Sequence, residues 1–238
     1  MKATIEQLRE AVEKAKTIAF FGGAGVSTES GIPDFRSTDG LYNQKYDYPP
    51  ETMLSHTFFV RHTEEFYRFY RDKMLYLDAK PNAAHQKLAE WEKQGKLNAV
   101  ITQNIDGLHQ MAGSKHVLEL HGSVLRNYCT KCRKFYDVTA ITGSTGVPKC
   151  ECGGTIKPDV VLYEESLDND VMDEAVRCIR DADMLIIGGT SLAVYPAAGL
   201  IHYFSGSTLA LINQDATPLD ERADLVLHDS IGKVFGAL

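Results

Sequence analysis

The chain has 238 residues, enough to bury a complete hydrophobic core without a partner subunit. Hydrophobic residues make up 44% and charged residues 24%, which excludes the disordered and collagen-like classes of protein. The formal net charge of -7 argues against nucleic acid or anionic lipid as a partner of the whole protein.

The N-terminal segment and the cysteines indicate the compartment. Acidic and amide side chains stand where a secretory signal would need an apolar run, and no apolar stretch reaches the roughly 18 residues of a membrane helix. Four of the five cysteines lie in two tight pairs, which suits a metal site better than a disulfide framework. We therefore expect a cytoplasmic protein without a membrane partner, for which a monomer would suffice.

Hydrophobic periodicity predicts the elements in chain order. A first helix begins with the capping-box spacing of Thr4–Gln7 and continues with Leu8, Val12 and Ala15 on one face up to Lys16. Short apolar runs predict buried strands at Thr17–Phe21, Leu97–Ile101, Val117–Leu120, Met184–Ile187, Thr208–Ile212 and Leu225–Leu227. Helical patterns between them lie at Asn82–Lys93, Asp170–Arg180 and Tyr195–Phe204. This alternation predicts an α/β fold with a parallel sheet.

Two stretches interrupt the alternation. Residues 37–79 contain many aromatic side chains and a helical run at Glu64–Leu77 but no pattern of a core strand. Residues 123–157 contain the cysteine pairs. We read both as insertions, a helical module and a zinc module, that together form a smaller second domain. The main Rossmann-like domain would then comprise residues 1–36, 80–122 and 158–238.

The first predicted strand runs into a glycine-rich turn, Gly23–Thr28. Its glycines would let backbone amides approach a pyrophosphate, but Thr28 stands where the usual dinucleotide fingerprint has its third glycine. A plain turn explains this partial match about as well. In the following loop, Arg36 could bind a phosphate and Phe35 could shield a reactive centre from water. On spacing alone, a surface loop with a packed Phe35 is the stronger interpretation.

Polar and glycine-bearing segments follow four more of the predicted strands. They are Thr102–Gly107, His121–Gly122, Gly188–Ser191 and Asn213–Asp215. Taken singly, the asparagines and aspartates are common turn formers, and a lone histidine is more often structural than a general base. Together they would line one cleft, because the carboxyl ends of parallel strands meet at one sheet edge.

The paired cysteines carry the most specific signal. They form a C-x2-C pair and a C-x-C pair that are seventeen residues apart: Cys129 with Cys132, and Cys150 with Cys152. Thiolates held in pairs by short turns suit tetrahedral zinc, and a site with four cysteines has no open position for catalysis. The sequence therefore predicts a structural zinc ion.

Three other features are predicted to be structural. His85 stands near a predicted helix start, where hydrogen bonding to backbone is the expected role. Cys178 shares a helical face with Ala175 and Ile179, as a core residue would. The aromatic cluster of the helical insert is interpreted as helix packing: Phe66, Phe69, Tyr70 and Tyr76.

Taken together, these motifs resemble the sirtuin family, in the order in which that family shows them. The resemblance rests on Gly23–Ser27, Gly31–Arg36, Thr102–Asp106, His121–Gly122, the two cysteine pairs, Gly189–Ser191 and Asn213, and it spans residues 20–231. It implies an inverted Rossmann-like NAD-binding domain, with NAD and an acyl-lysine protein or peptide entering a cleft from opposite sides. It also implies an NAD-dependent protein-lysine deacetylase or deacylase that produces nicotinamide, O-acyl-ADP-ribose and free lysine.

The resemblance assigns roles residue by residue. His121 would remove a proton from a ribose hydroxyl, with Asn104 also catalytic. The residues implied for phosphates and ribose are Ala24, Gly25, Thr28, Arg36, Gln103 and Asn104. Those implied for the nicotinamide are Phe35, Ile105 and Asp106. Those implied for the rest of NAD are Gly189, Thr190, Ser191, Asn213, Asp215 and Ile231. Backbone of Val160, Val161 and Leu162 would pair with the substrate peptide as an added strand.

The chain departs from the family pattern in places. Leu162–Glu165 replaces a phenylalanine-glycine-glutamate turn, which puts the shape of the peptide groove in doubt. Members specialised for acidic acyl groups carry a tyrosine and, three residues later, an arginine. Here Tyr67 is followed at that distance by Tyr70, with Arg71 one position further. We therefore predict removal of acetyl or other neutral acyl groups in preference to succinyl groups.

Two other functions would explain part of these motifs. A mono-ADP-ribosyltransferase would share the NAD cleft but pass ADP-ribose to protein. A zinc-ribbon binding module on a catalytically inactive α/β scaffold would explain the cysteines alone. The intact His121, Asn104 and Asp106 argue against the second.

Overall fold

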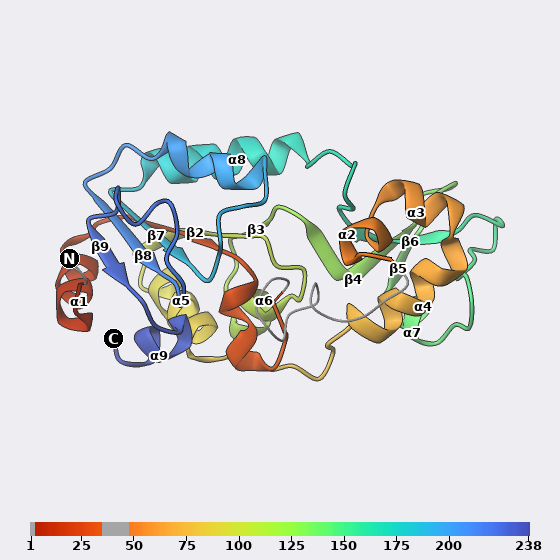
Figure 1. Ribbon diagram of the computed structural model, residues 1–238, viewed down its shortest axis with the longest axis horizontal. Coiled ribbons are helices and arrows are strands. Elements are labelled where there is room, and N and C mark those ends of the chain that lie inside the picture. The colour runs from red at the N-terminus through yellow and green to blue at the C-terminus, as the bar shows by residue number, and fades with distance from the viewer. Residues whose placement is uncertain (1–2, 35–47) are drawn as a thin grey trace.

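The computed structural model describes residues 3–34 and 48–238, which form a large α/β part and a smaller part at one end of it (Figure 1). Phe35 and Arg36, two of the predicted cofactor residues, lie outside the described residues. The large part contains a six-stranded parallel sheet, and the smaller part contains a three-stranded antiparallel sheet. The predicted α/β class with an inserted smaller part is therefore confirmed.

The six-stranded sheet has the order β3-β2-β1-β7-β8-β9. Its strands are β1 (Ile18–Gly22), β2 (Leu97–Thr102), β3 (Val117–Glu119), β7 (Met184–Gly188), β8 (Thr208–Ile212) and β9 (Leu225–Leu227). All six were predicted, with ends shifted by at most one residue. The chain adds β2 and β3 on one side of β1 and then returns to add β7 to β9 on the other. Because ligands bind where the winding of such a sheet reverses, the carboxyl ends of β1 and β7 are the expected place for a site.

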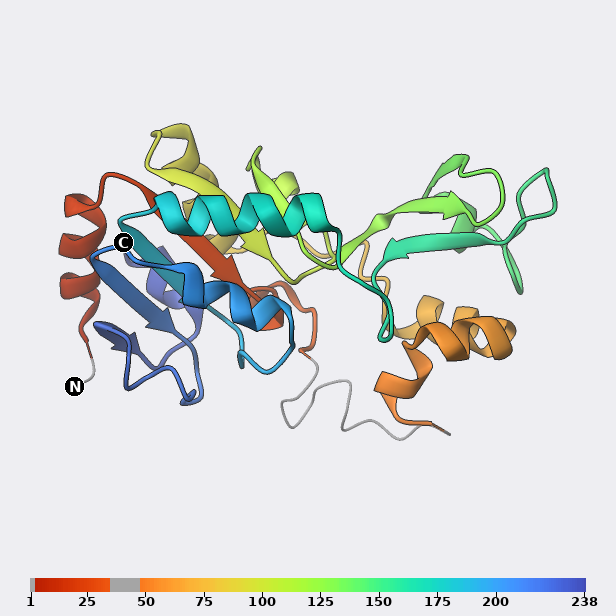
Figure 2. The same ribbon diagram turned by 90° about the horizontal axis from the view of Figure 1, so that it is seen from above.

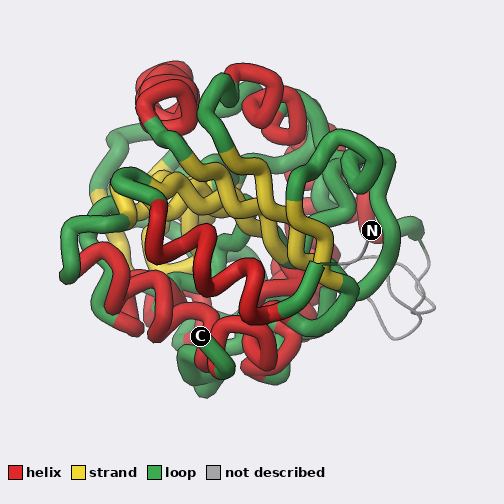
Figure 3. Tube along the Cα trace, turned by 90° about the vertical axis from the view of Figure 1, so that its left-hand side faces the viewer, coloured by secondary structure: helices red, strands yellow, loops and turns green. Residues whose placement is uncertain are grey.

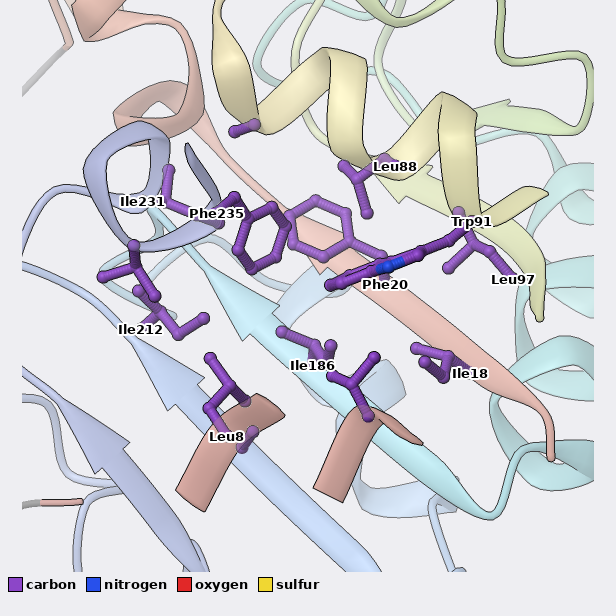
Figure 4. Close-up of a cluster of buried hydrophobic side chains, with 14 of the residues drawn as sticks. Leu8, Ile18, Phe20, Leu88, Trp91, Leu97, Ile186, Ile212, Ile231 and Phe235 are labelled. Atoms are coloured by element: carbon purple, nitrogen blue, oxygen red, sulfur yellow. The ribbon is translucent and has the colours of Figure 1, made fainter. Parts of the chain in front are cut away.

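Three helices cover one face of this sheet: α1 (Ile5–Lys14), α5 (Ala83–Lys93) and α9 (Ile231–Gly236). The predicted capping box starts α1, since the Thr4 hydroxyl accepts from Gln7 N at 3.2 Å and Thr4 N donates to Gln7 Oε1 at 2.9 Å. Under these helices the ring of Phe235 lies 6.1 Å from that of Phe20 and 5.1 Å from that of Trp91 (Figure 4). This apolar layer fixes the strands that carry the site.

The opposite face is covered by α8 (Asn169–Asp181) and η4 (Ala197–Tyr203), so the sheet lies between two helical layers (Figures 2 and 3). Cys178 is buried in this layer, as predicted. The segment predicted as an α-helix at Tyr195–Phe204 is instead the 3-10 helix η4. It contains Gly199, a poor α-helix former, and Gly199 N donates three residues back to Pro196 O at 2.9 Å.

The smaller part combines both insertions around one core. Its helices are α2 (Pro50–Met53), α3 (His56–Arg61), α4 (Thr63–Lys73) and α7 (Thr139–Thr142). Its strands are β4 (Gly122–Cys129), β5 (Phe135–Asp137) and β6 (Ile156–Val160), in the order β5-β4-β6. The predicted packing role of Phe66, Phe69 and Tyr70 is confirmed, because all three are buried in this core, whereas Tyr76 lines a cleft. Helix α4 ends at Lys73, four residues before the predicted end.

Among residues 3–34 and 48–238, no helix combines the length and apolar character needed to cross a membrane.

Candidate active site and zinc centre

A cleft of about 430 Å³ lies along the carboxyl ends of β1, β2, β7 and β8, where the two parts of the molecule face each other. Its lining includes every described residue predicted for NAD, the reaction or the peptide: Ala24, Gly25, Thr28, Gln103, Asn104, Ile105, Asp106, His121, Val160, Val161, Leu162, Gly189, Thr190, Ser191, Asn213, Asp215 and Ile231. The sequence did not assign several others that line it: Lys73, Met74, Leu77, Tyr195, Asp229 and Ser230. Segments up to about 200 residues apart in sequence are thus gathered in one place.

Two glycine turns form one wall of the cleft. Gly25 N donates to Gly189 O at 2.8 Å, which joins the turn after β1 to the turn after β7. A Cβ atom on Gly25 would lie 2.8 Å from Gly189 Cα, so the two backbones approach closely only because both residues are glycine. The short helices η1 (Ala24–Val26) and η2 (Thr28–Ser30) then lead away from this contact. A wall formed by backbone without large side chains lets a phosphate group approach closely.

A hydrogen-bonded network ties the β1 turn to the segment after β2. Ser27 Oγ donates to Asp106 Oδ2 at 2.6 Å, and Asn104 Nδ2 donates to Ser27 Oγ at 3.1 Å. Asp106 Oδ1 also accepts from Leu108 N at 2.9 Å, at the start of α6 (Leu108–Ala112). The network holds the Asn104 and Asp106 side chains in defined orientations. Ser27 was likewise assigned no role from the sequence, although this residue is 1% exposed and its hydroxyl is central to the network.

His121 is held in one tautomer. Its Nδ1 lies 3.0 Å from Gln103 O, and because a carbonyl oxygen only accepts, Nδ1 carries the proton. Nε2 is then the basic nitrogen of a residue that lines the cleft. Burial lowers the pKa of His121, and the hydrogen bond to Gln103 partly offsets this effect. The arrangement suits a neutral imidazole that accepts a proton.

The Gln103 side chain links two neighbouring strand ends, and the Asn213 side chain fixes the turn after a third. Gln103 Nε2 donates to Thr190 Oγ1 at 3.0 Å, which joins the ends of β2 and β7. Asn213 Nδ2 donates to Asp215 O at 2.9 Å, so the turn after β8 is closed by its own side chain. Polar atoms of four strand ends therefore lie in fixed positions along the cleft.

The turn that departs from the family pattern is well anchored. Glu164 takes the left-handed backbone conformation with φ 76°, which glycine adopts more readily. Glu165 Oε2 accepts from Leu162 N and from Lys157 Nζ, both at 2.9 Å, and Glu165 Oε1 lies 2.9 Å from His56 Nδ1. The turn is thus fixed to both β6 and α3.

The four cysteines converge as predicted. Their sulfur atoms all lie within 4.8 Å of one another. Sγ of Cys129 is 3.4 Å from that of Cys152, and Sγ of Cys132 is 3.6 Å from that of Cys150. Sulfurs bound to one tetrahedral zinc ion lie about 3.8 Å apart, from Zn–S bonds of about 2.3 Å. The backbone N–H of Cys132 contributes most to lowering the pKa of Cys129 to about 6. The donor set and its spacing fit zinc.

His85 has the structural role that its position predicts. Its Nδ1 accepts from the Asn82 backbone N–H at 3.2 Å, as part of the capping box that starts α5. Its ring lies 4.7 Å from that of His109 beneath the site. Burial lowers the pKa of His85 to about 4, so this side chain stays neutral at physiological pH.

Comparison with known proteins agrees with this geometry. The Sir2 family matches residues 23–196. A Clostridium acetobutylicum protein named NAD-dependent protein deacetylase is 62% identical over 235 residues, covering 97% of this chain and 96% of its own. A Clostridium perfringens protein of the same name is 60% identical, covering 99% and 98%. A solved structure of Sir2 with a p53 peptide and NAD+ has a TM-score of 0.88 at 40% identity, covering 98% of this chain and 96% of that one. A structure of Sir2 bound to acetylated peptide has the same TM-score at 39% identity, with coverage of 98% and 96%.

Proposed function

The chain belongs to the Sir2 family, the sirtuins, and from this membership we propose that it is an NAD-dependent protein-lysine deacetylase. Its products are nicotinamide, O-acyl-ADP-ribose and free lysine. The observation that carries the proposal is the convergence of Asn104, Asp106 and His121 with two glycine turns in one cleft. The names of relatives that cover nearly the whole chain support it.

The cleft suits NAD. Its volume of about 430 Å³ lies within the usual range for a cofactor site, and the glycines of the Gly25–Gly189 contact have no side chains that would keep a pyrophosphate away from the backbone. We assign phosphates and ribose to Ala24, Gly25, Thr28, Gln103 and Asn104. We assign the nicotinamide to Ile105 and Asp106. We assign the rest of NAD to Gly189, Thr190, Ser191, Asn213, Asp215 and Ile231. When bound, NAD supplies the ADP-ribose that accepts the acyl group as nicotinamide leaves.

His121 acts as the general base in this proposal. With its Nδ1 proton held by Gln103 O, its Nε2 takes a proton from a ribose hydroxyl. Asn104 and Asp106, held through Ser27, orient the ribose and the nicotinamide carboxamide. The chain's own contribution is therefore to position groups, exclude water and accept one proton.

The acyl-lysine peptide enters beside β6. Among the described strands β6 is at the edge of the three-stranded sheet, so a peptide can add to it by backbone hydrogen bonds. We assign Val160, Val161 and Leu162 to this contact. The anchoring of the following turn by Glu165 supports a groove that is formed before the peptide arrives.

A neutral acyl group suits the cleft better than a succinyl group. Tyr67 donates its hydroxyl to Ile156 O, and Tyr70 is fully buried. The Arg71 guanidinium donates to Ile141 O at 2.9 Å and to Ser144 Oγ at 2.8 Å. None of these three side chains is among the described residues that line the cleft, so none is positioned to bind a carboxylate there.

The zinc ion is structural in this proposal, because four thiolates leave it no open position. Cys129, Cys132, Cys150 and Cys152 would hold the β4–β5–β6 region together. Unpaired thiols suit a reducing compartment, so we assign the enzyme to the cytoplasm. We also keep the division into an NAD-binding domain (1–36, 80–122 and 158–238) and a small domain (37–79 and 123–157).

The experiment is an incubation of the zinc-loaded protein with NAD and an acetyl-lysine peptide, with all products identified by mass. We expect free lysine peptide, nicotinamide and O-acetyl-ADP-ribose in equal amounts. ADP-ribose attached to protein would point instead to a mono-ADP-ribosyltransferase. No turnover of NAD with any acyl peptide, by a folded protein, would indicate a binding module.

A further inference from the structure

A second group of metal-binding side chains lies outside the cleft and the cysteine cluster. His116 precedes β3, and Glu174 and Cys178 stand one helical turn apart on α8, which packs against β2 and β3. One donor atom from each lies within 4.8 Å of the other two. None of the three residues lines the cleft.

His116 is held in the orientation and tautomer of a metal ligand. Its Nδ1 lies 2.6 Å from Asn98 O, so Nδ1 carries the proton and Nε2 keeps its lone pair. Its backbone N–H donates to Glu92 Oε1 at 2.6 Å, which fixes the main chain. Histidines that bind metals usually donate their other ring N–H to a carbonyl or carboxylate in this way.

The separations match those of ligands around one ion better than those of direct hydrogen bonds. His116 Nε2 lies 3.7 Å from Glu174 Oε1, beyond hydrogen-bond length. Cys178 Sγ lies 3.9 Å from the same oxygen. Donors around one tetrahedral zinc ion lie about 3.3 to 3.8 Å apart, given bonds of about 2.0 to 2.3 Å. Small side-chain rotations would therefore bring all three donors to bonding distance.

The surroundings suit a cation that enters from solvent. Cys178 is 7% exposed, whereas the His116 and Glu174 side chains are 42% and 35% exposed. Glu174 Oε2 is paired with Arg177, which leaves Oε1 for the cluster. On binding, a metal–sulfur bond would replace the S–H bond and the proton would pass to water.

We propose that His116, Glu174 and Cys178 bind a second zinc ion, with water as the fourth ligand. One imidazole, one carboxylate and one thiolate are the donor types that zinc takes in proteins, and the two anionic groups neutralise its charge. The ion links α8 to β3, the edge strand that leads to His121. It is distinct from the four-cysteine site and does not depend on the proposed deacetylase activity.

The test is the zinc content of the full-length, tag-free protein after equilibrium dialysis against micromolar free zinc. We expect two zinc ions per chain for the wild type and one for Cys178→Ser and for His116→Ala. Arg180→Gln is the matched control, because it removes an exposed cation on the same helix that supplies no ligand, and it should keep two. One ion in the wild type, or two in both ligand variants, would overturn the proposal.

A second measurement covers the case in which a variant fails to fold. Cobalt added to wild-type protein that already holds zinc at the four cysteines should enter the second site, because cobalt competes poorly with zinc for the first. We expect one further equivalent to produce a thiolate-to-cobalt absorption band and to raise Tm by several degrees. Absence of the band at saturating cobalt would rule the site out.

Discussion

The backbone N–H of Val161 donates to the carbonyl oxygen of His121 at 3.0 Å. The strand assigned to the peptide is thereby joined to the residue assigned as the base. Gly122, directly after His121, lies opposite Val160 in the β4–β6 pairing, so the two elements are also in register. We infer that peptide binding and proton transfer share one rigid support, and that a change in this support will affect both.

Gly122 is a position in this support that has no room for a side chain. Its φ is 76°, and a Cβ atom there would lie 1.8 Å from Asp159 O. We expect Gly122→Ala to lower Tm strongly and to reduce kcat/KM at least tenfold, because β4 must move away from β6 and carry His121 with it. Gly146→Ala is the control, since Gly146 has φ 69° but open space around its Cβ position. It should cost only the left-handed strain of about 1–2 kcal/mol and leave kcat/KM unchanged. Equal effects of the two variants on kcat/KM would contradict this view of the support.

The pH dependence of catalysis should reflect the burial of His121. The base works in its neutral form, and burial lowers its pKa. The acid limb of the kcat/KM profile, which reports the free enzyme, should therefore have its midpoint below about 6.5, the ordinary value for histidine. The sign for stability is the same: the folded state resists protonation of His121, so acidification through this range favours unfolding. A kcat/KM midpoint above the ordinary value would show that the imidazolium is stabilised in the cleft.

Acyl selectivity follows from two side chains of α4 whose polar groups are already hydrogen-bonded to backbone carbonyls. Because Tyr67 and Arg71 are hydrogen-bonded to Ile156 and Ile141, a succinyl carboxylate would enter the cleft without either of these two side chains as a partner. We expect kcat/KM for an acetyl-lysine peptide to exceed that for the matched succinyl-lysine peptide by at least tenfold. The comparison uses one peptide sequence with the two acyl groups. Faster turnover of the succinyl peptide would show that another cation binds the carboxylate.

Removal of the zinc held by the four cysteines should unfold the smaller part. Structural zinc contributes apparent binding free energy on the order of 10 kcal/mol, which is folding free energy in such modules. We expect Cys129→Ala to lose this ion, to lower Tm and to abolish deacetylation. The helices that cover the parallel sheet should stay folded and keep their circular-dichroism signal. Cys178→Ser is the control for loss of a buried thiol and should retain deacetylation. Full activity of a Cys129→Ala protein shown to lack zinc would refute the structural role.

The sequence predicted the parallel sheet well because its central strands β1, β2 and β7 are buried on both faces and read as continuous apolar runs. Strands β8 and β9 were predicted with their observed bounds. Strands β4, β5 and β6 were not predicted. The β4–β6 pairing shifts register between Ser123 and Asn127, and β4 buries both of these polar residues, so its apolar alternation is broken. Such burial depends on partners distant in the chain, which a local pattern cannot show.

The gathering of the polar strand ends in one cleft was predicted from the sequence and agrees with the lining of the cleft, while the role of each residue stays a prediction. Glycines, amides and carboxylates at strand ends are visible in sequence, and the parallel sheet brings them to one edge. The sequence did not indicate which contacts hold these groups in place. The Ser27 hydroxyl is hydrogen-bonded to both Asn104 and Asp106, and Glu165 accepts a hydrogen bond from the turn after β6. Both depend on contacts between residues far apart in the chain or across a turn of unusual sequence. Similarly, His116 meets Glu174 only because α8 packs beside β3.

The most direct measurement is the rate and stoichiometry of deacetylation by wild type and His121→Ala, with peptide and NAD affinities measured alongside. We expect one nicotinamide and one O-acetyl-ADP-ribose for each lysine freed by the wild type. We expect His121→Ala to lose about 10²–10⁴-fold in kcat, as is typical for a missing general base, while peptide affinity changes little. Undiminished deacetylation by His121→Ala would refute the role of His121 as the base, because the proton would then leave the ribose without this imidazole.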